Sequence, residues 1–167
     1  LNTEIKPFDN KLVRRAMNYA VDKQAIVDAI YFGFGAPARG PLSPVIWGFD
    51  PKREPAYPYN PEKARELLKE AGFPDGFDMT IFSDNRTERR SAAELIQAYL
   101  SEVGIRAQVE LMEWSALLST SAKGIGGAFM LGWTGTGDAD GGMTPVYHTA
   151  NIGSSNRFRY SIPALDA

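Results

Sequence analysis

Apolar residues in the first part of the chain recur at intervals of three and four, which is the period of an α-helix. The pattern predicts three helices, because each apolar stretch begins at a capping residue and the second and third stop at a glycine. The expected starts are Asp9 or Asn10, Asp22, and Asn60 followed by Pro61, and the expected stops are Gly33 and Gly72.

Strand and helix patterns alternate in the second half of the chain. The expected strands are 77–82, 105–111 and 128–133, and the expected helices are 88–103, capped by Thr87, and 114–122. The third strand is almost entirely apolar, so we expect it to be buried on both faces. This alternation is typical of an α/β fold in which helices flank a small, mostly parallel sheet.

Proline and glycine are concentrated in two stretches. Seven of the 11 prolines lie between Pro37 and Pro61, and eight of the 16 glycines lie between Gly124 and Gly142. Proline removes a backbone donor and disfavours helix in the residue before it, so the first stretch is predicted to be irregular. The second allows sharp turns and close backbone approach. Long loops of this kind are often functional.

The composition narrows the classes of function. Hydrophobic residues make up 44% of the 167 positions, as in an ordinary globular domain, and the net charge of −2 argues against binding to nucleic acid or anionic membranes. With no cysteine and a single histidine, His148, the chain has no thiolate zinc site, no Cys nucleophile and no two-histidine metal site. No apolar stretch is long enough to span a membrane, and residues 1–30 lack a signal-peptide pattern.

Ligands of open parallel sheets bind beyond the carboxyl ends of the strands. Here those ends are 83–86, 112–114 and 132–140. The last of them lies in the glycine-rich stretch, so two independent features indicate the same place. We therefore predict a binding site at this edge of the sheet.

Three arginines, Arg86, Arg89 and Arg90, lie at the first strand end and in the first turn of the helix that follows. A helix N-terminus carries partial positive charge from the helix dipole, so cations there are mildly unfavourable. The arginines and the dipole together favour binding of an anion such as a carboxylate or phosphate at this place. The alternative is a solvated face on which Glu88 and Glu94 pair with the arginines.

Tryptophans lie at two of these strand ends. Trp133 can supply a flat apolar wall and one N–H donor to a ligand, or it can pack in the core. For Trp114 and Trp47 we expect packing.

Asp138 and Asp140 are the candidates for catalysis, as an acid/base carboxylate pair of a hydrolase. Residues two apart in such a loop more often turn the chain by accepting hydrogen bonds from their own backbone. The calcium-loop pattern that Asp138 to Gly141 begins has Tyr147 where a bidentate Glu is required. The dinucleotide pattern lacks its third glycine, and no serine-nucleophile motif is present. The sequence thus predicts no metal and no cofactor.

Several motifs, in order and with their spacing kept, resemble the extracytoplasmic solute-binding proteins of peptide-type ABC importers, the family of dipeptide-, oligopeptide-, glutathione- and nickel-binding proteins. The matching stretches cover nearly the whole chain and are residues 13–23, 58–64, 67–77, 103–105, 132–135, 155–157 and 160–161. Each motif alone is weak, whereas the ordered set is specific.

The resemblance implies a two-lobe periplasmic-binding-protein fold of type II, of which residues 1–167 form a single C-terminal ligand-binding lobe. The N-terminal lobe, the terminal helices and the export signal or lipid-anchor cysteine are then expected outside this sequence. It further implies a non-enzymatic protein, periplasmic or lipid-anchored on the outer face of the cytoplasmic membrane, that delivers a short peptide or peptide-like solute to an ABC permease. The alternatives are the Asp138/Asp140 hydrolase and a pure interaction module.

Relatives that bind dipeptides also imply ligand-binding residues. A Gly-Trp-Thr-Gly-like segment matches Trp133, Thr134 and Gly135 here, and the arginine that takes the ligand's carboxylate matches Arg90 or, one register away, Arg89.

The aspartate that clamps the ligand's amino group in those relatives is replaced by Thr136, and a neutral hydroxyl is a poorer partner for a buried ammonium. The resemblance to glutathione-binding members implies that Asp138 or Asp140 makes that contact instead. An isolated lobe offers one wall of the cleft, so we expect it to bind weakly or not at all.

Overall fold

The computed structural model describes residues 1–38, 40–50, 52, 57–134 and 137–166. Its helices and strands follow one another in the order that the sequence predicts, with one helix added near the end. They are α1 (Lys11–Ala20), α2 (Lys23–Tyr31), α3 (Pro61–Glu70), β1 (Asp78–Asp84), α4 (Thr87–Glu102), β2 (Arg106–Met112), α5 (Trp114–Ala122), β3 (Ala128–Phe129) and α6 (Ala139–Tyr147).

The three strands form a parallel sheet in the order β2-β1-β3. Ile81 in the central strand lies opposite Val109 on one side and Ala128 on the other. The predicted α/β fold with a small parallel sheet is therefore confirmed. Because β1 is flanked on both sides, whatever follows its carboxyl end lies in the middle of the sheet edge.

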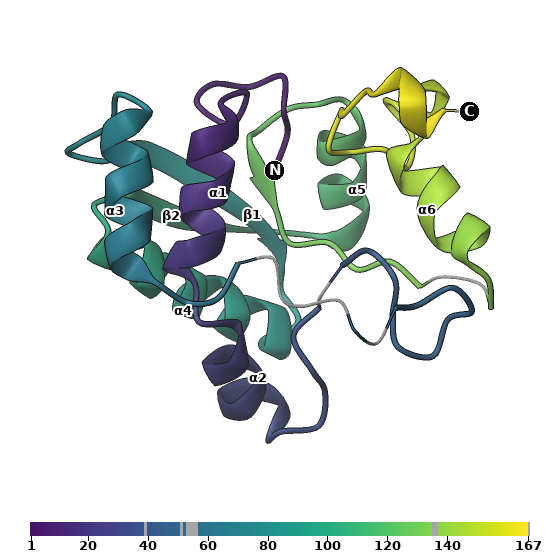
Figure 1. Cartoon of the computed structure of the whole chain (residues 1–167), viewed down its shortest axis with the longest axis horizontal. Helices are drawn as coiled ribbons and strands as arrows, with labels where there is room; N and C mark the ends of the chain where they lie inside the picture. The colour runs from purple at the N-terminus through teal and green to yellow at the C-terminus, as the bar shows by residue number, and fades with distance from the viewer. Residues whose placement is uncertain (39, 51, 53–56, 135–136, 167) are drawn as a thin grey trace.

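The hydrophobic core lies where α1, α3 and α4 meet one face of the sheet, and Figure 1 shows α1 and α3 side by side. Met79 and Ile81 contribute from β1, and the parallel register places Ala107 beside Met79. Leu68 and Leu100 are fully buried, which contributes about 2 kcal/mol each. At the other end of the molecule, α5 and α6 lie beside the C-terminal segment (Figure 1).

The first three helices begin at side-chain caps, as predicted. The Oδ1 atoms of Asn10, Asp22 and Asn60 accept hydrogen bonds from the backbone N–H groups of Leu12, Ala25 and Lys63 at 2.9, 3.0 and 2.9 Å. These bonds satisfy amides that have no partner inside the helix.

Two helix boundaries differ from the prediction. α2 ends at Tyr31, two residues before Gly33, because its C-cap Phe32 takes the left-handed conformation with φ 52°. The apolar stripe of α2 contains no buried residue, since the helix projects beyond the sheet (Figure 1). α4 begins at Thr87, and its N-cap is Arg86, without a side-chain cap.

The third strand is much shorter than predicted, and the expectation that it is buried on both faces is wrong. Among the described residues β3 pairs only with β1. After the hydrogen bond from Met130 N to Phe82 O at 2.8 Å the chain is irregular, and Gly132 and Trp133 are exposed. Within β3 itself Ala128 is buried and Phe129 is partly buried, so the burial that was expected of the whole stretch is limited to its start.

Helix α6 was not predicted, because Gly141, Gly142 and Pro145 disfavour helix. It forms from the N-cap Asp138, whose Oδ1 accepts a hydrogen bond from Gly141 N at 2.7 Å. Within the described parts of the chain, no helix has the length and apolar character needed to cross a membrane.

Candidate functional site

The central strand ends in two buried polar residues, Ser83 and Asp84, which are 0% and 3% exposed. A buried carboxylate requires hydrogen-bond partners and a countercharge. Asp84 receives both from Arg86, whose Nε lies 2.8 Å from Oδ2, and from Arg89, whose Nη1 lies 3.2 Å from the same oxygen. We call Arg86 and Arg89 the arginine pair.

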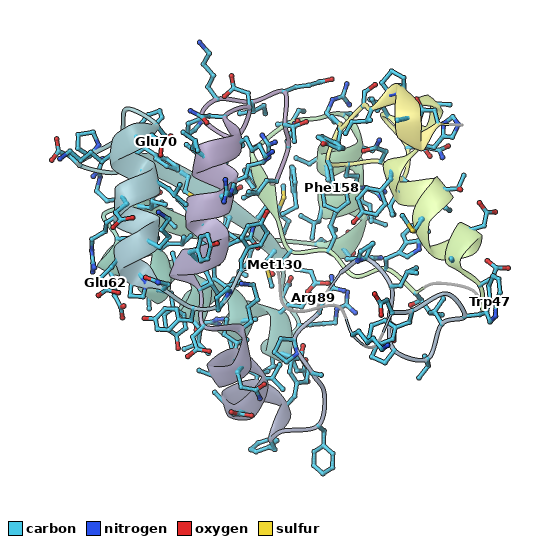
Figure 2. All side chains as sticks on the ribbon, in the orientation of Figure 1. Trp47, Glu62, Glu70, Arg89, Met130 and Phe158 are labelled. Carbon is cyan, nitrogen blue, oxygen red and sulfur yellow. The ribbon has the colours of Figure 1, made fainter. Side chains whose placement is uncertain are left out.

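Arg89 connects β1 to the segment after β3. Its side chain is 19% exposed, and besides Asp84 it contacts the carbonyl oxygen of Met130 at 3.5 Å (Figure 2). A side chain at position 132 would lie 2.5 Å from Arg89 Nη2, so the glycine there leaves room for the guanidinium. The strand end, the helix start and the glycine together fix where this charge lies.

Trp114 lies under both guanidinium groups. The Cζ atoms of Arg86 and Arg89 are 4.8 and 5.0 Å from its ring centroid, within the range of a cation–π interaction. Its side chain is 36% exposed. Trp114 thus packs, as expected, and its partners are the arginine pair. The expectation that Trp47 packs is wrong, because Trp47 is 82% exposed.

These groups form the wall of a depression of about 350 Å³ at the carboxyl edge of the sheet, which we call the tryptophan pocket. It is lined by Arg86, Arg89, Trp114, Gly132, Trp133 and Thr134. The three strand ends singled out in the sequence thus meet in one place. Guanidinium donors beside indole walls suit a carboxylate attached to an apolar group.

The other predicted site residues lie elsewhere or outside the described chain. Arg90 does not line the pocket and pairs with Glu94, with its Nε 2.8 Å from Oε1. Asp138 caps α6, and Asp140 is hydrogen-bonded to the Thr144 hydroxyl in the same helix. Gly135 and Thr136 are not among the described residues.

Arg86 and Asp84 are the site residues whose roles sequence reasoning missed. Arg86 was counted in a cluster with Arg89 and Arg90. In the structure, Arg86 at the N-cap of α4 and Arg89 in its first turn both pair with Asp84, whereas Arg90 pairs with Glu94. The sequence does contain a signal for this pairing, because Asp84 lies at a strand end, two positions before Arg86. In the described part of the chain, no group of three or more acidic or histidine side chains could hold a metal ion.

Burial acting alone would raise the pKa of the Asp84 carboxyl, but the hydrogen bonds from Arg86 and the charge of Arg89 hold that pKa below its usual value. A carboxyl whose pKa is lower in the folded than in the unfolded state stabilises the fold at pH values above the unfolded pKa of about 3.9. That stabilisation is lost as the pH falls through the pKa of the folded state. We therefore expect unfolding free energy to fall more steeply below about pH 4 in the wild type than in Asp84→Asn. Urea unfolding across this range measures it, and equal slopes would contradict the role of Asp84.

The family model for "Bacterial extracellular solute-binding proteins, family 5 Middle" matches residues 1–154. The chain belongs to this family. Among curated relatives of this chain, Heme-binding protein A of Haemophilus influenzae is 41% identical over 173 residues. Glutathione-binding protein GsiB of Pectobacterium atrosepticum is 38% identical over 175 residues. Both alignments cover 99% of this chain but only 31% and 34% of the relatives, so the chain spans about a third of their length.

Solved structures show the same fold. The periplasmic binding protein DppA of Helicobacter pylori, in complex with the peptide STSA, is 35% identical with a TM-score of 0.93. A dipeptide-binding protein of Pseudoalteromonas sp. SM9913, in complex with Met-Leu, is 33% identical with a TM-score of 0.89. The matches cover 99% of this chain and 33% and 36% of those chains.

These findings decide between the classes of function left open by the sequence. The family and its relatives are solute-binding proteins of peptide-type ABC importers and not enzymes. The hydrolase alternative therefore has no support from the family or these relatives.

Proposed function

We propose that residues 1–167 are the C-terminal ligand-binding lobe of a solute-binding protein that encloses a short peptide or peptide-like solute. The solute, a dipeptide, an oligopeptide or a glutathione-like conjugate, lies between this lobe and an N-terminal lobe. Closure of the lobes about a hinge precedes delivery to an ABC permease. The intact protein works in the periplasm or is held by a lipid anchor on the outer face of the cytoplasmic membrane.

The observation that carries this proposal is the placement of Arg89 over Trp114 at the carboxyl edge of the sheet. Asp84 and the carbonyl oxygen of Met130 hold the Arg89 guanidinium in place, so that it can bind an anion that enters the tryptophan pocket. The peptide complexes of the two related structures are consistent with a ligand that has a terminal carboxylate.

Arg89, Trp133 and Thr134 are the ligand contacts we propose among the described residues. Arg89 binds the carboxylate, the Trp133 ring, 49% exposed, covers apolar ligand surface, and the Thr134 hydroxyl offers a hydrogen bond. Gly135 and Thr136 continue the same segment of the sequence.

Ligand identification on the intact protein tests this proposal. Native mass spectrometry of the protein purified without added solute is expected to show a bound mass that fragments as a short peptide or peptide conjugate. A bound haem, a metal chelate, or a protein that neither carries nor binds any peptide would contradict it.

The isolated chain of 167 residues is expected to bind peptides weakly, with dissociation constants in the millimolar range or above. The tryptophan pocket is one wall, whereas tight sites enclose about 70–90% of a ligand's surface. Calorimetry that gave micromolar binding to this chain alone would show that the second lobe is not needed.

A further inference from the structure

Three aromatic side chains at the C-terminal end of α2 lie in solvent, and we call them the aromatic rim. Phe32 is 83% exposed, Phe34 is 86% exposed and Tyr31 is 43% exposed. Aromatic side chains can bury about 150–250 Å² each, so the two phenylalanines alone expose about 300 Å² of apolar surface. An apolar patch of this size is about the largest that a monomeric soluble protein exposes, and such a patch often has a function.

The backbone holds these rings outward. Phe32 takes the left-handed conformation at the end of α2, and Phe34 N donates a hydrogen bond to the carbonyl oxygen of Tyr31 at 2.7 Å. At Gly35 the chain has folded back toward α2, because an added Cβ there would lie 3.8 Å from Val27 Cγ1. The rings are therefore presented to solvent by an ordered turn.

The aromatic rim adjoins the candidate site. Tyr31 and Phe32 line a depression of about 530 Å³ between α2 and the first turn of α4. The arginine pair lines both this depression and the tryptophan pocket, so the rim lies beside that pocket. Phe34 lines neither of the two depressions. Figure 1 shows that α2 projects beyond the sheet here.

The position of the rim indicates what covers it. In the proposed function, an N-terminal lobe encloses the ligand and therefore extends over the edge of the sheet that holds the tryptophan pocket. The chain spans about a third of the length of its curated relatives, which leaves ample length for such a lobe. Interfaces between domains of one chain typically bury about 600–1,500 Å², so two exposed rings beside the pocket supply a substantial part of one.

We propose that the aromatic rim is the surface on which the N-terminal lobe of the same protein docks in the closed, ligand-bound state, with Phe34 contacting that lobe and not the ligand. This inference rests on the proposed function, in which two lobes enclose the solute. The facing surface of the other lobe is expected to be apolar, because exposed rings gain most from apolar contact. The rim then stabilises the closed state whatever ligand is bound, so it contributes to affinity and not to selectivity.

A lobe contact and a ligand contact have different effects on binding. A side chain that touches only the other lobe changes the free-energy difference between the open and closed states. Every ligand that requires closure then loses affinity by the same factor when that side chain is removed. A side chain that touches the ligand changes the affinity for some ligands more than for others.

Calorimetry on the intact protein tests the role of Phe34. The probes are a panel of free dipeptides that includes Ala-Ala, Phe-Ala and Ala-Phe. Phe34→Ala is expected to weaken every member that binds by the same factor of about tenfold, and Phe34→Leu, which keeps most of the apolar area, by about twofold or less.

Ile125→Ala is the matched control. The Ile125 side chain is 57% exposed, but it precedes the amino end of β3 and so lies at the opposite edge of the parallel sheet. We expect this variant to bind the panel as the wild type does.

Hydroxyl-radical footprinting of the intact protein, read by mass spectrometry, measures the contact itself. Oxidation of Phe32 and Phe34 is expected to fall about threefold or more when a saturating dipeptide from the panel is added, because closure covers both rings. Oxidation of Ile125 is expected to stay the same.

The outcomes separate the two proposals. A Phe34→Ala variant that binds the panel as the wild type does, or that weakens only some of its members, overturns the docking surface and leaves the proposed function standing. Oxidation of Phe34 that does not change on ligand binding has the same consequence. A wild type that binds no member of the panel overturns both.

Discussion

Replacing Gly76 by alanine is expected to lower the free energy of unfolding by about 3 kcal/mol or more. A Cβ atom there would lie 1.8 Å from the carbonyl oxygen and 2.3 Å from the carbonyl carbon of Gly104. Gly76 also has φ +73°, which disfavours any side chain.

The clash cannot be relieved locally, because the contacted atoms are backbone and the turn is held on both sides. Arg106 N donates to Phe77 O at 2.9 Å, and Arg106 Nη1 donates to Asp75 O at 3.0 Å. A shift of the turn would therefore disturb the point at which β1 and β2 begin to pair.

Gly72→Ala is the matched control for this prediction. Gly72 has φ +88° but no atom within 4 Å of an added Cβ, so only the backbone strain of about 1 kcal/mol applies. Urea unfolding followed by circular dichroism compares the two variants. A Gly76→Ala variant that loses no more stability than Gly72→Ala would show that the turn is not closely packed against Gly104.

Replacing Asp84 by asparagine is expected to cost about 2 kcal/mol of unfolding free energy. The substitution keeps the shape but removes the one negative charge shared by the arginine pair, and the loss of one partner from a buried ion pair is strongly destabilising. We place the cost below the range for fully buried pairs, because the Arg86 side chain is 55% exposed and screened by water.

Asp78→Asn is the control, at the opposite end of the same strand. Asp78 pairs with Arg106 at 2.7 Å, but its side chain is 81% exposed, so little measurable loss is expected. Unfolding free energies that are equal for the two variants would mean that Asp84 does not hold the arginine pair in place.

The sequence predicts the framework well because its helices carry local signals. The caps at Asn10, Asp22 and Asn60 and the apolar spacing after them depend on neighbouring residues alone, and the structure confirms all three. The length of β3 could not be predicted, since it depends on which strands lie beside it. The apolar run that begins at Ala128 does not indicate that two of its residues pair with β1 and that the rest is irregular.

The sequence predicts that the strand ends lie at one edge of the sheet, and the structure places Arg86, Trp114 and Trp133 around one depression there. The strand ends follow from the parallel pattern, which placed Arg89 and Trp133 near each other. Pairing of Asp84 with residues two and five positions ahead depends on how the chain turns from β1 into α4, and side-chain direction there is not encoded in spacing. For the same reason Arg89, and not Arg90, enters the pocket.

We propose above all that Arg89 in the tryptophan pocket binds the ligand's carboxylate. The most direct measurement is calorimetry on the intact protein with a bound peptide as free acid and as C-terminal amide, for the wild type, Arg89→Ala and the neighbouring Arg90→Ala. We predict that the wild type and Arg90→Ala prefer the acid by about tenfold or more, and that Arg89→Ala loses this preference. An Arg89→Ala variant that still prefers the acid as strongly as the wild type would contradict the claim.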